Sequence, residues 1–177
     1  GESAADWLAR VDERELKRVL KQYGEEAAAA GIARAIVRAR SEQPVRRTRE
    51  LADIVERVVP RHRSRRHPAT KTFQAIRMVV NDELAQIASA LEATIGVLAP
   101  GGRLCVISFH SLEDRLVKRF MRDHSREAEA YRGMPEVPPD ARPTLRLIGK
   151  PIAASDAEQA SNPRSRSARL RVAERVA

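Results

Sequence analysis

The residues best placed to do chemistry are Ser108, Phe109 and His110, which lie at the end of the short apolar run of residues 103–109. In open α/β folds, ligands bind beyond the carboxyl ends of the strands, which is where these three residues would lie. The imidazole of His110 can accept a proton or donate a hydrogen bond near neutral pH. The ring of Phe109 can stack on a nucleic-acid base. We therefore expect a site at these three residues.

The same segment also has a purely structural interpretation. Ser111 can cap the helix that follows, and Glu113 and Asp114 would then lie at the positively polarised end of that helix. Phe109 would be a core residue. Because capping boxes of this kind are common, the pattern is equally compatible with both interpretations.

Two basic segments can bind the phosphate groups of a nucleic acid. The first enters a predicted helix and contains Arg61, Arg63, Arg65, Arg66 and Lys71. The second precedes and enters the last predicted strand and contains Arg164, Arg166, Arg169 and Arg171. The alternative for the first segment is a solvated surface loop. Alternatively, Arg169 and Arg171 only form the solvent-exposed face of the last predicted strand, because residues two apart lie on the same face of a strand.

Several other kinds of site are absent from the sequence. It contains no P-loop, no Gly-x-Gly-x-x-Gly, no HExxH helix and no nucleophile elbow. His62 and His67 are five residues apart in a predicted loop, which does not suit a pair of metal ligands, so we expect no metal site. Cys105 lies in the middle of a predicted strand and is expected to be a small buried core residue.

The composition favours a globular protein with a polyanionic partner. Hydrophobic residues make up 42% of the 177 residues, which is enough for a core. Lys and Arg together number 33 against 24 acidic residues, for a net charge of +9, and arginine dominates the basic residues. Arginine suits phosphate oxygens, although the codon bias of a GC-rich genome would also explain the excess. Since aromatic residues make up only 3%, phosphate contacts would dominate over base stacking.

The same composition predicts a cytoplasmic protein that does not enter a membrane. No apolar run approaches the length of a membrane helix. The N-terminus lacks the pattern of a secretory signal. A single cysteine excludes an internal disulfide framework.

The elements that must position these residues fall into two parts. Apolar residues at helical spacing predict helices from residue 12 to 23, from 25 to 40 and from 48 to 58, with Ser3, Asp12 and Thr48 as caps. A mostly helical stretch runs from residue 70 to about 98. The period then changes: residues 103–109 read as a strand buried on both faces of a parallel sheet. Residues 144–148 and 168–176 read as alternating strands, so the sheet is incomplete.

Five separated strings resemble signatures of the MraW/RsmH family, which comprises bacterial S-adenosylmethionine-dependent methyltransferases. They cover almost the whole chain, in the same order as in the family. The strings are residues 67–77, 80–84, 98–104, 107–115 and 162–168.

The resemblance implies a fold and a division into domains. The family has a class I (Rossmann-like) methyltransferase sheet with strand order 3-2-1-4-5-7-6 and an α-helical domain inserted after strand four. Residues 1–66 would be part of that inserted domain, and residues 67–177 the C-terminal half of the methyltransferase domain. The fold class is therefore α/β, with residues 103–109 as strand five, 144–148 as strand six and 168–176 as an antiparallel strand seven.

The resemblance also implies an activity. Members of the family methylate the exocyclic N4 of a cytosine in the decoding region of 16S rRNA, so the expected partner is the small ribosomal subunit. Ser108, Phe109 and His110 would then line the pocket for the target base, and the basic segments would hold rRNA phosphates. A non-catalytic RNA-binding module is the alternative function.

The family differs from this sequence in length. Its Gly-rich cofactor loop, the acidic residue for the ribose and strand four lie upstream of the segment that matches Gly1. We therefore expect a C-terminal portion that is inactive alone, with S-adenosylmethionine bound mainly by residues outside it. Strand five would lack its neighbour, strand four, and would have an unpaired edge. An unpaired edge favours pairing with another chain, as in a homodimer.

Overall fold

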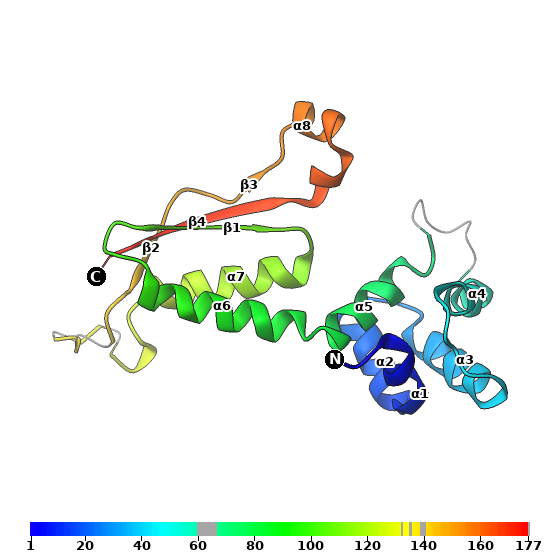
Figure 1. Ribbon diagram of the computed structural model, residues 1–177. Helices are drawn as coiled ribbons and strands as arrows, with labels where there is room; N and C mark the ends of the chain where they lie inside the picture. The colour runs from blue at the N-terminus through cyan, green and yellow to red at the C-terminus, as the bar shows by residue number, and fades with distance from the viewer. Residues whose placement is uncertain (60–66, 132, 135, 139–140, 177) are drawn as a thin grey trace. The chain divides into compact units, whose positions relative to one another are not determined.

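The computed structural model describes residues 1–59, 67–131, 133–134, 136–138 and 141–176, which form two compact units (Figure 1). The first unit comprises Gly1–Glu83 and the second Leu84–Ala177. Arg61, Arg63, Arg65 and Arg66 lie outside the described residues. None of the helices in the described part of the chain is both long and apolar enough to cross a membrane.

The first unit is a helical cluster around one apolar core. Its helices are α1 (Ala4–Arg10), α2 (Glu13–Gln22), α3 (Ala29–Glu42), α4 (Thr48–Val58) and α5 (Thr70–Val80). Helices α2, α3 and α4 turn one face each inward, and their fully buried side chains include Leu16, Leu20, Ile32, Ile36 and Val55. Burying each such side chain contributes about 1.5–3 kcal/mol, which holds these otherwise marginal helices together.

The helix starts in this unit agree in part with the sequence analysis. Ser3 caps α1 through a capping box with Asp6, and Asp12 caps α2 by accepting a hydrogen bond from the backbone N–H of Glu15. The expected cap at Thr48 is wrong, because the N-cap is Arg47 and Thr48 is the first helical residue. The carboxylate of Glu50 accepts hydrogen bonds from the backbone N–H groups of Arg46 and Arg47, at 2.8 and 2.9 Å.

The helical stretch expected from residue 70 to 98 is interrupted at Asn81 and Asp82. Helix α5 ends at Val80, and α6 (Glu83–Val97) begins after Asp82, which has a φ of 50°. Asparagine and aspartate tolerate this left-handed conformation better than most residues, so the break has a local cause. Helix α5 packs on α1 and α2. The first compact unit therefore extends to Glu83, beyond the division after residue 66 that the sequence analysis expected.

The second unit combines a small antiparallel sheet with helices. After α6 come β1 (Arg103–Ser108), α7 (Ser111–His124), the short 3-10 helix η2 (Glu129–Tyr131), β2 (Leu145–Leu147), β3 (Ile152–Ala153), α8 (Asp156–Ser161), the 3-10 helix η4 (Pro163–Ser167) and β4 (Arg169–Arg175). The strand order is β1-β4-β2, and β3 also pairs with β4. All three partners are antiparallel to β4.

The core of this unit lies on one face of the sheet, where α6 and α7 run side by side (Figure 1). Leu91 of α6, Phe120 and Met121 of α7, and Leu104 and Leu145 of the strands belong to one buried cluster. The strands expected at 144–148 and 168–176 are confirmed within a few residues, with β4 antiparallel as expected, whereas β3 has only two residues and was not predicted.

Strand β1 is not buried on both faces, which corrects the sequence analysis. Its residues alternate: Leu104 and Ser108 are buried, whereas Cys105 and Ile107 are exposed, Ile107 at 58%. The expectation that Cys105 lies in the core is therefore wrong, because helices cover only one face of this sheet among the described residues. On one edge β1 pairs with β4, and its other edge has no partner strand in the described part of the chain.

Candidate functional site

Ser108, Phe109 and His110 lie where β1 ends and the chain turns into α7. Ser108 is buried, and its hydroxyl donates a long hydrogen bond of 3.4 Å to the carbonyl oxygen of Arg169 on β4. Phe109 is 55% exposed, so its ring is not a core residue. The His110 side chain is 16% exposed. Of the three, Phe109 therefore presents its side chain most openly.

His110, and not Ser111, is the N-cap of α7, which corrects the expected capping box. The backbone of His110 is extended, with φ −144° and ψ 165°, and its Nδ1 accepts a hydrogen bond from the backbone N–H of Glu113 at 3.3 Å. The Glu113 carboxylate in turn accepts a hydrogen bond from the backbone N–H of Phe109 at 2.8 Å. These two bonds fix the backbone of both candidate residues relative to the first turn of α7.

The second ring nitrogen of His110 is differently placed. Its Nε2 lies 2.9 Å from a carboxylate oxygen of Glu113, an ion pair if the ring is protonated. The direction of the contact does not meet hydrogen-bond geometry, so Nε2 is buried without a hydrogen-bond partner among the described residues. Because Nδ1 accepts a hydrogen bond, Nε2 carries the proton of the neutral ring. Nε2 is thus enclosed beside the Glu113 carboxylate, whereas the ring of Phe109 is open to solvent.

An ion pair between α7 and β4 supports this end of the unit. The guanidinium of Arg171 binds the Asp114 carboxylate through two hydrogen bonds, of 2.7 and 2.9 Å, with side chains only 15% and 20% exposed. The hydrogen bonds from Arg171 hold the pKa of Asp114 below its usual value, although partial burial opposes the shift. Arg171 is therefore engaged within the protein, and its expected role as a phosphate contact is not supported by this geometry.

The other basic residues fall in different places. Arg164 and Arg166 are exposed on η4, and no ion pair of their side chains is found among the described residues. Because Ser108 pairs with Arg169 in the sheet, η4 and the Ser108–His110 segment lie at the same end of β4. Lys71 belongs to the first unit, where its Nζ donates a hydrogen bond of 2.8 Å to the carbonyl oxygen of Glu25.

The connection from β1 to α7 differs in composition from a glycine-rich cofactor loop. A backbone that approaches a cofactor closely after a strand needs glycine, which has no side chain to collide with it. The connection from β1 to α7 consists of Phe109 and His110 and has no glycine. What this segment offers is an exposed aromatic face and nearby exposed arginines, which suit a nucleic-acid base and its phosphates.

Sequence reasoning missed the role of Glu113 as a cap and the row of charged side chains along one face of α7. Glu113 lies three residues after the N-cap, the position from which a glutamate reaches back to cap the preceding backbone. Asp114, Lys118 and Arg122 are spaced four residues apart on α7, which places them on one helix face. That spacing is visible in the sequence and is the signal that could have found them.

Comparison with known proteins gives a consistent result. The model of a family described as the MraW methylase family matches residues 1–176. The chain is 57% identical over 179 residues to "Ribosomal RNA small subunit methyltransferase H" of Thioalkalivibrio sulfidiphilus (strain HL-EbGR7), covering 100% of this chain and 57% of that protein. It is 53% identical over 176 residues to the protein of the same name from Xanthomonas campestris pv. campestris (strain B100), covering 99% and 51%. The chain thus spans about half the length of the curated relatives it matches.

Proposed function

Since the chain belongs to the MraW methylase family, as the resemblance in its sequence predicted, we propose that it is the base-facing and rRNA-facing part of a ribosomal RNA methyltransferase. The proposed reaction transfers a methyl group from S-adenosylmethionine to the exocyclic N4 of a cytosine in the decoding region of 16S rRNA. The substrate would be the small ribosomal subunit, in the cytoplasm. The relatives are named as small-subunit rRNA methyltransferases, which supports the class of reaction.

The arrangement of the sheet supports the assignment to a class I methyltransferase domain. The order β1-β4-β2, with β4 antiparallel to both neighbours, agrees with strands five, seven and six of that sheet. We propose that residues outside this chain continue the sheet along the free edge of β1 and supply most of the cofactor site. The first compact unit would then be part of the inserted helical domain.

The end of β1 is suited to hold a base that has left its stack. An enzyme that modifies an amino group on a base must first expose that group, at a cost of a few kcal/mol. The exposed ring of Phe109 offers a face on which the base can stack, and its backbone is held by Glu113. His110, as the N-cap of α7, would hold the backbone that presents this ring. Ser108, whose hydroxyl is turned to β4, would shape the pocket floor.

Arginine side chains near the same end would hold the rRNA strand. Arg164 and Arg166 are exposed next to β4, at the end where Ser108 pairs with Arg169. We assign them, with Arg61, Arg63, Arg65, Arg66 and Lys71, to phosphate contacts. Phosphate contacts fix the position of the strand and leave recognition of the base to the pocket.

The observation that carries this proposal is the exposed, backbone-anchored ring of Phe109, and its replacement is the test. We expect Phe109→Ala in the full-length protein to lower kcat/KM for methylation of small ribosomal subunits by about 5- to 160-fold, because one base–aromatic stack contributes about 1–3 kcal/mol. Phe109→Tyr should retain most activity, since it keeps the aromatic face.

The matched control is Tyr131→Ala, which removes another partly exposed aromatic ring of the same unit. It should leave the activity near that of the unchanged protein. Full activity of Phe109→Ala, with an unaltered circular dichroism spectrum and cofactor affinity, would leave only a structural role for this segment and disprove the base pocket.

A further inference from the structure

A cavity in the second unit lies between α7 and the turn that joins β2 to β3. Its volume is about 250 Å³. We call it the α7–turn pocket and define it by five basic side chains and an apolar floor. The basic side chains are Lys118, Arg122, Arg126, Lys150 and Arg171, and the floor includes Met121, Leu147 and Pro151.

The charge around this pocket is strongly positive. None of its lining residues is acidic. Arg171 is matched by Asp114, and Arg122 forms an exposed ion pair with Asp123 at 2.7 Å. No ion pair within the described residues is found for Arg126 or Lys150. The pocket therefore keeps positive charge that the protein itself does not neutralise.

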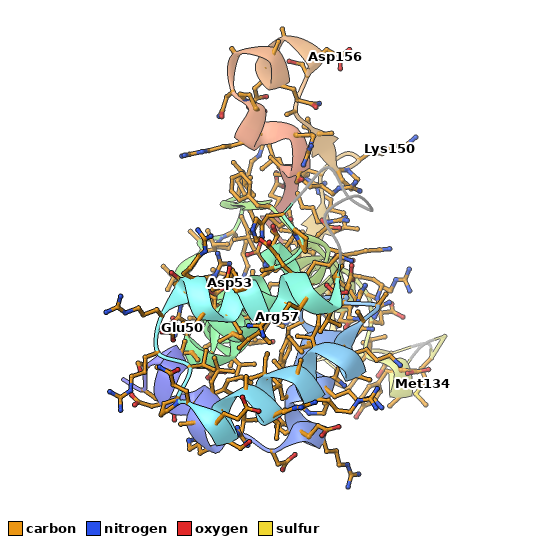
Figure 2. All side chains as sticks on the ribbon, turned by 90° about the vertical axis from the view of Figure 1, so that its right-hand side faces the viewer. Glu50, Asp53, Arg57, Met134, Lys150 and Asp156 are labelled. Atoms are coloured by element: carbon orange, nitrogen blue, oxygen red, sulfur yellow. The ribbon has the colours of Figure 1, made fainter. Side chains whose placement is uncertain are left out.

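Two of these side chains are open to solvent. Arg126 follows the end of α7 and is exposed, as is Lys150. Figure 2 shows the side chain of Lys150 extending away from the ribbon. Their charged groups can thus reach a ligand without first breaking a contact within the described protein.

The floor of the pocket is apolar for a reason that lies in the sheet. Leu145 and Leu147 point to the same face of β2, the face that α7 covers. Leu145 is fully buried there, whereas Leu147, beyond the end of the core, is half-exposed. A ligand that contacts Leu147 and Pro151 would cover apolar surface that the protein leaves open to water.

The turn that carries Lys150 is fixed in position. Gly149 has a φ of 67°, a conformation that glycine adopts without strain. The backbone N–H of Ile148 donates a hydrogen bond of 3.0 Å to the carbonyl oxygen of Val172 on β4. The rim is therefore preformed on one side by this turn and on the other by α7.

We propose that the α7–turn pocket binds one nucleotide unit of a single-stranded RNA segment. Arg126 and Lys150 contact the phosphodiester, Lys118 adds its charge from α7, and the ribose and base cover the apolar floor. Uncompensated cations next to exposed apolar surface fit a nucleotide, whose phosphate is anionic and whose base has a flat face that can pack on apolar side chains. This inference rests on the proposed function for the choice of RNA, and the pocket uses none of the residues assigned above to RNA contacts.

A salt series with charge-reversal variants tests the pocket. The probe is a short, fluorescein-labelled single-stranded RNA, and binding to the 177-residue chain is followed by fluorescence anisotropy. Each phosphate contact adds about 0.7 to the slope of log K against log salt for single strands. Arg126→Glu/Lys150→Glu should therefore lower that slope by about 1.4 and weaken binding at every salt concentration.

The control is a double variant with the same net charge as the test variant. Arg14→Glu/Arg119→Glu reverses two exposed arginines, one on α2 and one on α7 outside the pocket. Its slope should match that of the unchanged chain. Equal losses of slope in both double variants would overturn the pocket and leave the proposed function intact. Failure of the unchanged chain to bind RNA at any salt concentration would overturn both the pocket and the RNA contacts of the proposed function.

Lysine footprinting locates the contact independently. The chain has five lysines, of which only Lys118 and Lys150 line the pocket. Acetylation in the presence of the RNA, read by mass spectrometry, should be slowed at these two and unchanged at the exposed Lys17 and Lys21. Protection that is uniform over all four residues would contradict a specific pocket.

Discussion

The bidentate pair between Asp114 and Arg171 ties the first turn of α7 to β4. It lies between the strand-end site and the α7–turn pocket and contributes to the geometry of both. Since the two side chains are mostly shielded from water, their attraction is screened less than that of an exposed pair. Removal of either charge would leave the other one partly buried and unmatched.

We expect Asp114→Asn to lower the free energy of unfolding by about 2 kcal/mol at pH 7, because charge-assisted hydrogen bonds are lost. The folded-state pKa of Asp114 lies below the unfolded value near 4. The stabilisation is therefore complete above the unfolded pKa and is lost as the pH falls through the folded one. Urea unfolding from pH 7 to pH 2.5 should show the gap between the two proteins closing.

The control for this prediction is Asp123→Asn, which removes an exposed pair with Arg122. Exposed pairs contribute about 0–1 kcal/mol, so this variant should stay close to the unchanged chain. If both variants lost the same stability at pH 7, the Asp114–Arg171 pair would not have the structural role described.

At the scale of single residues, the sequence predicts well where a helix begins, but it predicts only in part which residue caps the helix. For α4 and α7 the hydroxyl residues Thr48 and Ser111 suggested the cap, yet each is the first helical residue. In both helices the residue three positions after the observed N-cap is a glutamate, Glu50 or Glu113, that accepts backbone N–H groups before the helix. The glutamate was thus the better indicator, because it satisfies donors that a hydroxyl one residue later does not reach.

Among the elements, β1 is the one whose environment the sequence did not predict. The apolar run of residues 103–109 is compatible with burial on two faces or on one, since the run itself does not say what covers it. The described chain covers only the face of Leu104 and Ser108. The outward side chains, Cys105 and Ile107, are exposed as a consequence.

The reactivity of the Cys105 thiol measures the solvent exposure of this face of β1. We expect this thiol to react with a disulfide reagent such as DTNB in the native 177-residue chain, at a rate within about tenfold of that of a free thiol, because exposure governs access to the thiolate. Absorbance of the released thiolate measures the reaction. A thiol that reacts only after denaturant is added would restore the buried position that the sequence analysis expected.

At the scale of the whole chain, two apolar clusters divide the described residues. One contains Leu16, Leu20 and Ile36, and the other Leu104 and Phe120, with no residue in common. The sequence predicted a helical part followed by a sheet part, because the hydrophobic period changes at Arg103. The family resemblance placed the domain division after residue 66, whereas the first compact unit extends to Glu83 because α5 packs on the helices before it. The strand order was predictable only through the family resemblance.

We proposed that residues outside this chain supply most of the cofactor site. The 177-residue chain is therefore expected not to bind S-adenosylmethionine by itself. The connection from β1 to α7 consists of Phe109 and His110 and lacks the glycine that lets a backbone approach a cofactor closely. Isothermal titration should give no heat of binding at micromolar chain concentration, whereas the full-length protein should bind. Tight binding by the chain alone would show that the cofactor site lies within these residues.

The separate clusters have an evolutionary consequence. Substitutions that share no contacts act almost additively on stability. A change that repacks Leu20 or Ile36 therefore leaves the packing around Phe120 as it was. Lineages can thus diversify the helical cluster of the first unit without compensating mutations beneath the sheet.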